Sequence, residues 1–236
     1  MIHGRARRPE SGVTLRTALA HRVSLATPGL AVLMLVAAVS GCATSSRSKS
    51  TSATSPTPMS AVPAERFLAA LATHCGQAFA GRVLVDTPVS ATPSAFAGKP
   101  LVMHVRGCDD PARELRVPFH VGDDHSRTWV LTRTATGLRL KHDHRHADGS
   151  ADALTQYGGA TIDAGSANRQ EFPVDAESIA LFKRLGSTAS LSNTWAMEIQ
   201  PGRSVVYELS RPGGRLFRVE FDLTQPVALP PAPWGS

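Results

Sequence analysis

The sequence predicts a mainly β domain: an antiparallel meander of about eight strands, closed as a barrel or a two-sheet sandwich, with two short helices. The main evidence is the alternation of apolar and polar residues, which is clearest over residues 115–121 and 216–223. Such alternation places one face of a strand in the core and the other in water, as in antiparallel sheets. Because a single long open sheet would leave unpaired edges, we expect this sheet to close on itself.

Two helices are expected beside these strands. The first begins at Pro63, which suits a first helical position, and stops at Gly76. Apolar residues at helical spacing between these two positions form its buried stripe. The second runs from Asp175, a suitable N-cap, to Leu185, and basic residues occupy its last turn before Gly186. Both segments lack the strand alternation that dominates the rest of the domain.

The strands and turns follow from the same patterns. The clearest expected strands are 101–106, 115–121, 129–131, 138–146 and 216–223. Clusters of Gly, Asp and Pro predict turns at 122–124, 136–137, 148–149, 201–202 and 212–214. Gly158-Gly159 is also assigned to a turn, because a phosphate-binding loop would have to join a strand to a helix. The architecture resembles lipocalin-like barrels, a resemblance of shape that carries no signature residues.

The segment Val39-Ser40-Gly41-Cys42 ends a short apolar run behind a basic N-terminus. It resembles the lipobox of bacterial lipoproteins. The resemblance implies that residues 1–41 are a signal peptide and that Cys42 is acylated, which anchors the protein to a membrane. Ala43, where Asp commonly retains lipoproteins at the inner membrane, favours the outer membrane, facing the periplasm. Ordinary signal cleavage, with Cys42 unmodified, is the alternative.

The remaining chain divides by composition. Residues 42–62 are rich in Ser, Thr and Pro, so we expect a flexible tether behind the lipidated cysteine. Residues 63–228 form a single β-rich domain, which is long enough for one core. The proline-rich residues 229–236 are expected to form an extended tail.

Charge argues against a nucleic-acid partner. The whole chain has a formal charge of +6, but residues 1–41 hold five of its 25 basic residues and one of its 19 acidic residues. The remainder therefore has 20 basic and 18 acidic residues, a net charge of +2. Phosphate-backbone binding requires a much stronger basic footprint. The expected partners are the membrane, through the lipid anchor, and a small apolar ligand or another envelope protein.

Two further cysteines, Cys75 and Cys108, form an even pair in a protein expected to be exported. We therefore predict a disulfide between them, because exported proteins fold in an oxidising compartment. Two buried free thiols are the alternative.

Alternate histidines make residues 138–146 the most chemically suggestive segment. On a strand, His142 and His144 share one face with Leu138 and Leu140. A turn at 136–137 with an even loop would pair this face with Trp129, so we expect the histidines to point inward. His-x-His pairs on strands can bind zinc, given a third ligand. The candidates for that ligand are His146, His120, His125, Asp123 and Asp124. The alternative is a wet strand end with solvated histidines.

The functional expectations follow from these features. Neither Gly-x-Ser-x-Gly nor His-Glu-x-x-His occurs, and we expect a protein that is not an enzyme. The stretches 73–76, 120–125 and 141–146 resemble a group of proteobacterial secreted or lipoprotein sequences without an assigned function. The first hypothesis is a cell-envelope lipoprotein whose β domain binds a small ligand or has a structural role. The second is a metal-binding protein or metal-dependent enzyme, with a divalent ion such as zinc at His142 and His144.

Overall fold

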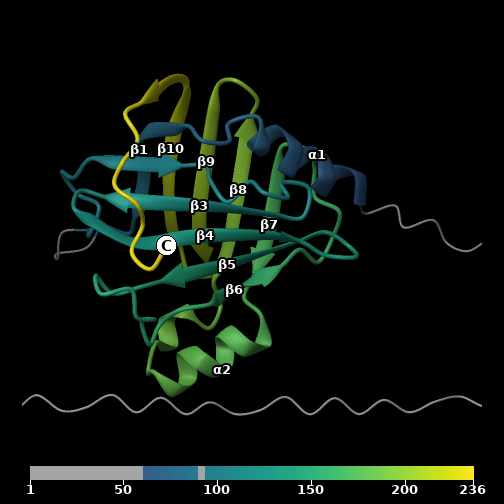
Figure 1. Ribbon diagram of the computed structural model, residues 1–236. Helices are drawn as coiled ribbons and strands as arrows, with labels where there is room; N and C mark the ends of the chain where they lie inside the picture. The colour runs from purple at the N-terminus through teal and green to yellow at the C-terminus, as the bar shows by residue number, and fades with distance from the viewer. Residues whose placement is uncertain (1–60, 90–93) are drawn as a thin grey trace, which may run out of the picture. The chain divides into compact units, whose positions relative to one another are not determined.

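A computed structural model of the protein describes residues 61–89 and 94–236 (Figure 1). The expected signal peptide, Cys42 and nearly all of the expected tether lie outside the described residues. The described chain forms one sheet of ten strands, with two α-helices and a short 3-10 helix, η1 (Thr188–Ser190). The strands are β1 (Ala78–Thr87), β2 (Leu101–His104), β3 (Glu114–Val121), β4 (Asp124–Arg133), β5 (Leu138–His144), β6 (Tyr157–Ala160), β7 (Arg169–Pro173), β8 (Thr194–Gln200), β9 (Ser204–Arg211) and β10 (Arg215–Val227).

The sheet is a nearly closed antiparallel barrel, which confirms the predicted fold class. Its strand order is β6-β5-β4-β3-β2-β1-β10-β9-β8-β7, so strands that follow each other in sequence are neighbours in the sheet except β6 and β7, and β1 also pairs with β10. In Figure 1, β3, β4 and β5 run across the page, whereas β8, β9 and β10 run up it. Two irregularities in the β1–β10 pairing accompany this change of direction. The steep crossing encloses the core between two orthogonal layers.

The barrel has one seam, between β6 and β7, which are not paired in a ladder. The main chain of Gly158 crosses this seam instead. Its carbonyl accepts from the Asp175 amide at 2.9 Å, and its amide donates to the Ser178 hydroxyl at 2.8 Å. The assignment of Gly158-Gly159 to a turn was wrong: both glycines lie in β6. A Cβ at Gly158 would come within 1.9 Å of the Leu140 carbonyl oxygen, and one at Gly159 within 1.8 Å of the Pro173 carbonyl oxygen. Only glycine therefore lets β6 approach both neighbours.

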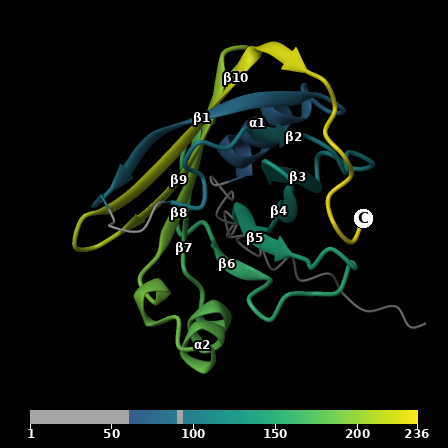
Figure 2. The ribbon, with the colours of Figure 1, turned by 90° about the vertical axis from the view of Figure 1, so that its left-hand side faces the viewer.

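The two predicted helices are present and lie at opposite ends of the barrel (Figures 1 and 2). Helix α1 (Ala61–Ala72) begins before Pro63, so the end of the expected tether belongs to the domain. Helix α2 (Ala176–Arg184) is capped by Asp175, whose side chain accepts from the Ser178 amide, as the sequence predicted. Each helix buries its apolar face on the barrel core, through residues such as Leu68 and Phe182. No helix in the described part of the chain is long and apolar enough to span a membrane.

The predicted disulfide joins Cys75, just after α1, to Cys108, after β2, with a Cα–Cα distance of 6.2 Å. It closes a loop of 33 residues. In the chain-entropy model, a loop of this length stabilises the folded state by roughly 3–4 kcal/mol. The bridge therefore fastens the helix at one end of the barrel to the sheet.

The C-terminal residues 229–236 belong to no helix or strand, and they pack on the domain. After β10 they cross the outer face of β3 and β4 (Figures 1 and 2). The Trp234 amide donates to the His125 carbonyl oxygen at 3.0 Å, and Pro233 is buried. Residues 229–236 are therefore part of the domain surface.

Candidate functional site

A cavity of about 200 Å³ lies inside the barrel, toward the end covered by α2. Its lining is dominated by aromatic rings. These are Phe96, Phe119, Trp129, Tyr157, Phe182, Trp195, Tyr207 and Phe217. They come from both layers of the barrel, from α2 and from the chain before β2. Several are stacked on one another: the Trp129 ring lies 4.4 Å from that of Tyr207, and the Phe96 ring lies 4.6 Å from that of Phe217. The cavity wall is thus formed by aromatic side chains that also belong to the barrel core or pack against it.

The predicted register of the histidine strand is present. Trp129 pairs with His142, and Leu131 with Leu140, so the leucine–histidine face of β5 points inward. His142 is only 4% exposed, and His144 is half-buried at the cavity lining. Asp143 points to the opposite face, yet it is also buried because the Arg145 side chain covers it at 2.9 Å. Orientation, rather than burial alone, therefore distinguishes the two faces of this strand.

His142 lies between two tyrosines that fix its tautomer. Its Nδ1 lies 3.1 Å from the Tyr157 carbonyl oxygen, and its Nε2 lies 2.9 Å from the Tyr207 hydroxyl. A carbonyl oxygen can only accept, so Nδ1 carries the proton and Nε2 accepts from the tyrosine. The Tyr157 hydroxyl in turn bonds to Nε2 of His144 at 3.1 Å. Both ring nitrogens of His142 are therefore occupied by protein groups.

The imidazole and phenol groups that line the cavity are uncharged near pH 7. Burial, reinforced by His144, lowers the pKa of His142 to about 3. Burial and the nearby Arg127 lower the pKa of His144 to about 4. Burial raises the pKa of Tyr157 to about 12, and it raises that of Tyr207 well above 10. The imidazoles and phenols are thus uncharged hydrogen-bonding groups in an apolar wall.

All the formal charge of the lining comes from Arg127, Arg211 and Arg215. Arg127 donates to Asp124 at 2.7 Å, and its guanidinium lies over the Phe96 ring at 5.8 Å. Arg215 forms an ion pair with Asp86. Arg211, at the end of β9, donates through Nε to the amide oxygen of Asn193. Among the described residues that line the cavity, none is an Asp or Glu.

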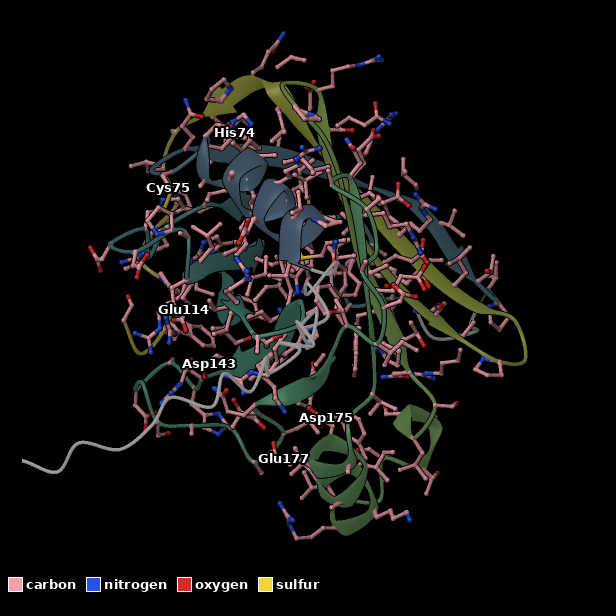
Figure 3. All side chains as sticks on the ribbon, turned by 90° about the vertical axis from the view of Figure 1, so that its right-hand side faces the viewer. His74, Cys75, Glu114, Asp143, Asp175 and Glu177 are labelled. Atoms are coloured by element: carbon pink, nitrogen blue, oxygen red, sulfur yellow. A yellow bond between two sulfur atoms is a disulfide. The ribbon has the colours of Figure 1, made fainter. Side chains whose placement is uncertain are left out.

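Helix α2 forms the floor of the cavity and is held across the seam. Phe182 on this helix packs against Tyr157 with ring centroids 5.4 Å apart. On the outside of β5, Lys141 bonds to Asp175 at 2.7 Å and to Glu177 at 3.3 Å. Figure 3 shows these two acids at the start of α2. The outward face of the histidine strand thus positions the helix whose inner face closes the cavity.

The candidate metal ligands lie at three separate places. His142 and His144 are inside the barrel. His120 and His125 lie on the outer face of the barrel with their Nδ1 atoms 2.8 Å apart, and Trp234 of the C-terminal tail lies against His125. His146, beyond the end of β5, is exposed and lies 3.9 Å from Asp152.

The acids proposed as third ligands do not join them. Asp124 pairs with Arg127, and Asp123 is in the turn before β4. Across residues 61–89 and 94–236, no three His, Cys, Asp or Glu side chains are grouped so that they could hold a metal ion. The geometry therefore gives the zinc hypothesis no support.

Some residues of the cavity escaped the sequence analysis. Tyr157 lies in the short β6, which has no alternation, and Arg211 lies next to a turn, where an arginine is ordinary. Tyr207 is a buried residue of β9, where a tyrosine is ordinary. One signal was available. Tyr207, Leu209 and Arg211 alternate along β9, so the sequence places all three on the same face of that strand, and all three line the cavity. Parity alone could not show that the arginine lacks an acidic neighbour.

No family model, curated protein or solved structure matches this chain. Its function is therefore inferred from the lipobox-like segment and from the cavity.

Proposed function

We propose that the protein is a cell-envelope lipoprotein whose β-barrel binds a small ligand in the cavity beside His142. The lipobox-like segment ending at Cys42 and the Ser/Thr/Pro-rich segment behind it support a lipid anchor and a tether. By the same argument, the domain faces the periplasm from the outer membrane.

The cavity is the observation that carries the binding function. Stacked aromatic rings line it, and a few polar groups converge on it, which is the usual composition of a small-molecule site. Its buried hydrogen-bonding groups are already satisfied by one another, as in the Tyr157–His142–Tyr207 chain. A preformed wall of this kind loses little conformational entropy on binding. The metal-dependent alternative lacks a comparable observation, because the His142 ring nitrogens already have partners.

Binding can be tested on the full chain in dodecyl maltoside micelles. A panel of one-ring fragments should raise the melting temperature, because a ligand that binds only the folded state stabilises it. Leu154→Trp places a large ring at a residue that lines the cavity and should abolish the shift. Ile162→Trp is the matched control, since Ile162 is 84% exposed and does not line the cavity. Shifts that persist in Leu154→Trp, or the absence of any shift, would contradict the proposal.

The anchor is tested separately. Cys42→Ser should prevent incorporation of a fatty-acid label and leave the precursor unprocessed, whereas Cys75→Ser should leave labelling intact. A Cys42→Ser protein that is still labelled and processed would overturn the lipoprotein assignment.

A further inference from the structure

Arg211 differs from the other two arginines of the cavity because it has no acidic partner. Arg127 pairs with Asp124 and Arg215 pairs with Asp86, but within the described residues no carboxylate lies at ion-pair distance from Arg211. Its one recorded partner is the neutral side chain of Asn193. The segments 1–60 and 90–93 hold a single acid, Glu10, in the expected signal peptide. Asp86, which lines a neighbouring pocket together with Arg211, is paired with Arg215 instead. In the described part of the chain, Arg211 therefore has no carboxylate at ion-pair distance.

The surroundings of Arg211 increase the effect of this missing partner. The side chain is half-buried, and Asn193 beside it is 4% exposed. Burial, with the nearby Arg215, lowers the pKa of Arg211. A guanidinium nevertheless stays protonated in proteins. Partly buried guanidinium groups are usually paired, because removing a charge from water is costly. With Nε used by Asn193, the terminal nitrogens remain for an anion, and a guanidinium suits a carboxylate or a phosphate.

The size of the cavity limits what can accompany that anion. An engineered cavity of about 150 Å³ holds one benzene molecule. The cavity here, at about 200 Å³, has room for one ring and a small substituent. Its walls are aromatic faces, which favour a flat ligand. Arg211 belongs to the same lining, so a ring in the cavity can place its substituent at the guanidinium.

We propose that the ligand is a small aromatic acid: one planar ring inside the cavity, with a carboxylate or phosphate group on Arg211. This proposal rests on the proposed binding function and names the chemical class of its ligand. The ring contributes apolar contact, and the single anionic group, which neutralises an otherwise unpaired charge, contributes specificity. Neutral rings of the same size should bind more weakly because they leave the guanidinium unpaired.

The test compares four probes on the full chain in dodecyl maltoside: benzoate, phenyl phosphate, benzamide and toluene. A charged hydrogen-bonded pair gained on binding should make benzoate, phenyl phosphate or both at least about tenfold tighter than benzamide by calorimetry. Benzoate and phenyl phosphate together distinguish a carboxylate from a phosphate preference. Arg211→Gln should remove the advantage of the anions and leave the affinity for benzamide unchanged. Arg203→Gln is the control, because Arg203 is exposed and outside the cavity lining.

A second variant keeps the proposal testable if Arg211→Gln does not fold. Arg211→Lys retains the charge but not the planar donors, so it should keep a preference for the anions that weakens as salt is added. Equal binding of benzoate and benzamide, or anion binding that Arg211→Gln leaves unchanged, would overturn the aromatic-acid proposal and leave the binding function standing. A lack of binding by all four probes would count against both proposals.

Discussion

The two faces of the sheet each carry a pair of buried or half-buried histidines, and the pairs are built differently. Inside, His142 and His144 are joined through Tyr157, whose carbonyl oxygen accepts from His142 and whose hydroxyl bonds to His144, and the second ring nitrogen of His142 accepts from Tyr207. Outside, His120 and His125 bond to each other through their Nδ1 atoms. The Nε2 atom of His120 is buried and has no hydrogen-bond partner in the described structure.

This contrast shows that a buried histidine need not have hydrogen-bond partners for both of its ring nitrogens. In the inner pair, His142 is buried in the barrel core and His144 is half-buried beside it. On the outer face, the C-terminal tail contacts His125, since the Trp234 ring lies against the His125 ring with centroids 6.3 Å apart. Burial lowers the pKa of His120 to about 4, with His125 adding to the effect. The pKa values of His142 and His120 are thus both lowered by burial, but His142 is held by hydrogen bonds inside the barrel, whereas His120 lies beside His125, which the C-terminal tail contacts.

The largest expected effect compares His142→Phe with His120→Phe. Phenylalanine keeps the ring volume at both positions, so the hydrogen bonds decide the outcome. At position 142 the change leaves the Tyr157 carbonyl and the Tyr207 hydroxyl unpaired inside the barrel, which should lower the free energy of unfolding by about 3 kcal/mol. At position 120 one bond is lost and one unsatisfied nitrogen disappears, so the cost should be about 1 kcal/mol or less. Urea denaturation measures both values, and equal losses would remove the distinction between the pairs.

Acid should destabilise the protein through both pairs. His120, His142 and His144 have lowered pKa values in the folded state, so below pH 6.5 the unfolded chain binds more protons than the folded one. Their stabilising contribution is complete above pH 6.5 and declines as the pH falls toward about 4. Each group contributes a slope of at most about 1.4 kcal/mol per pH unit. His142→Phe should flatten this slope, with His146→Gln, which removes an exposed imidazole, as the control. A slope that does not change in His142→Phe would contradict the assignment.

Loosening the tail should affect only the outer pair. Trp234→Ala should cost about 1 kcal/mol of stability, because a half-buried ring is lost. It should also raise the pKa of His120 toward 6.5, because its partner His125 loses the contact with Trp234 and becomes more exposed to water, and it should leave the pKa of His142 unchanged. Histidine ring signals in an NMR titration report the two values separately. Leu229→Ala, at a tail residue that is 61% exposed, is the matched control. A shift at His142 as large as that at His120 would show that the two faces are coupled.

The smallest expected effect is that of zinc. Micromolar zinc should leave the melting temperature unchanged, because both ring nitrogens of His142 are hydrogen-bonded and no third ligand is near. A rise in melting temperature that disappears in the His142→Ala/His144→Ala double mutant would support the metal hypothesis. It would also contradict the contrast between an inner pair whose His142 nitrogens are hydrogen-bonded and an outer pair in which one His120 nitrogen has no partner.

Local patterns predicted much of this fold. Alternation identified β3 and β10, and the Asp175 cap and Gly186 stop bracketed α2 closely. Register, inferred from loop parity, placed His142 beside Trp129. Short edge strands escaped prediction: β6 contains Gly158-Gly159, and glycine has no side chain to alternate. The estimate of about eight strands, against the ten observed, fell short for such reasons.

The chemistry of the cavity was harder to predict because its partners are distant in sequence. Tyr157 and Tyr207 lie 15 and 65 residues from His142. These residues meet because the barrel closes with a particular offset between its strands. That offset cannot be read from the sequence of any single strand. The special position of Arg211 depends on the absence of an acid beside it, and that too is a property of the assembled walls.

The seam between β6 and β7 has a consequence for the chain's connectivity. Ala78 pairs with Val227, so the barrel's first and last strands meet, while its unpaired edges fall in mid-sequence. A circular permutant that starts at β7, joins β10 to β1 and stops at β6 would read the strands in the order in which they lie side by side. Its ends would fall at the seam, where no ladder of hydrogen bonds is interrupted. In the natural order, the chain passes from β6 to β7 across the seam. The two glycines of β6 allow this strand to come close enough to the segment after β7 for Gly158 to bond to Asp175 and Ser178.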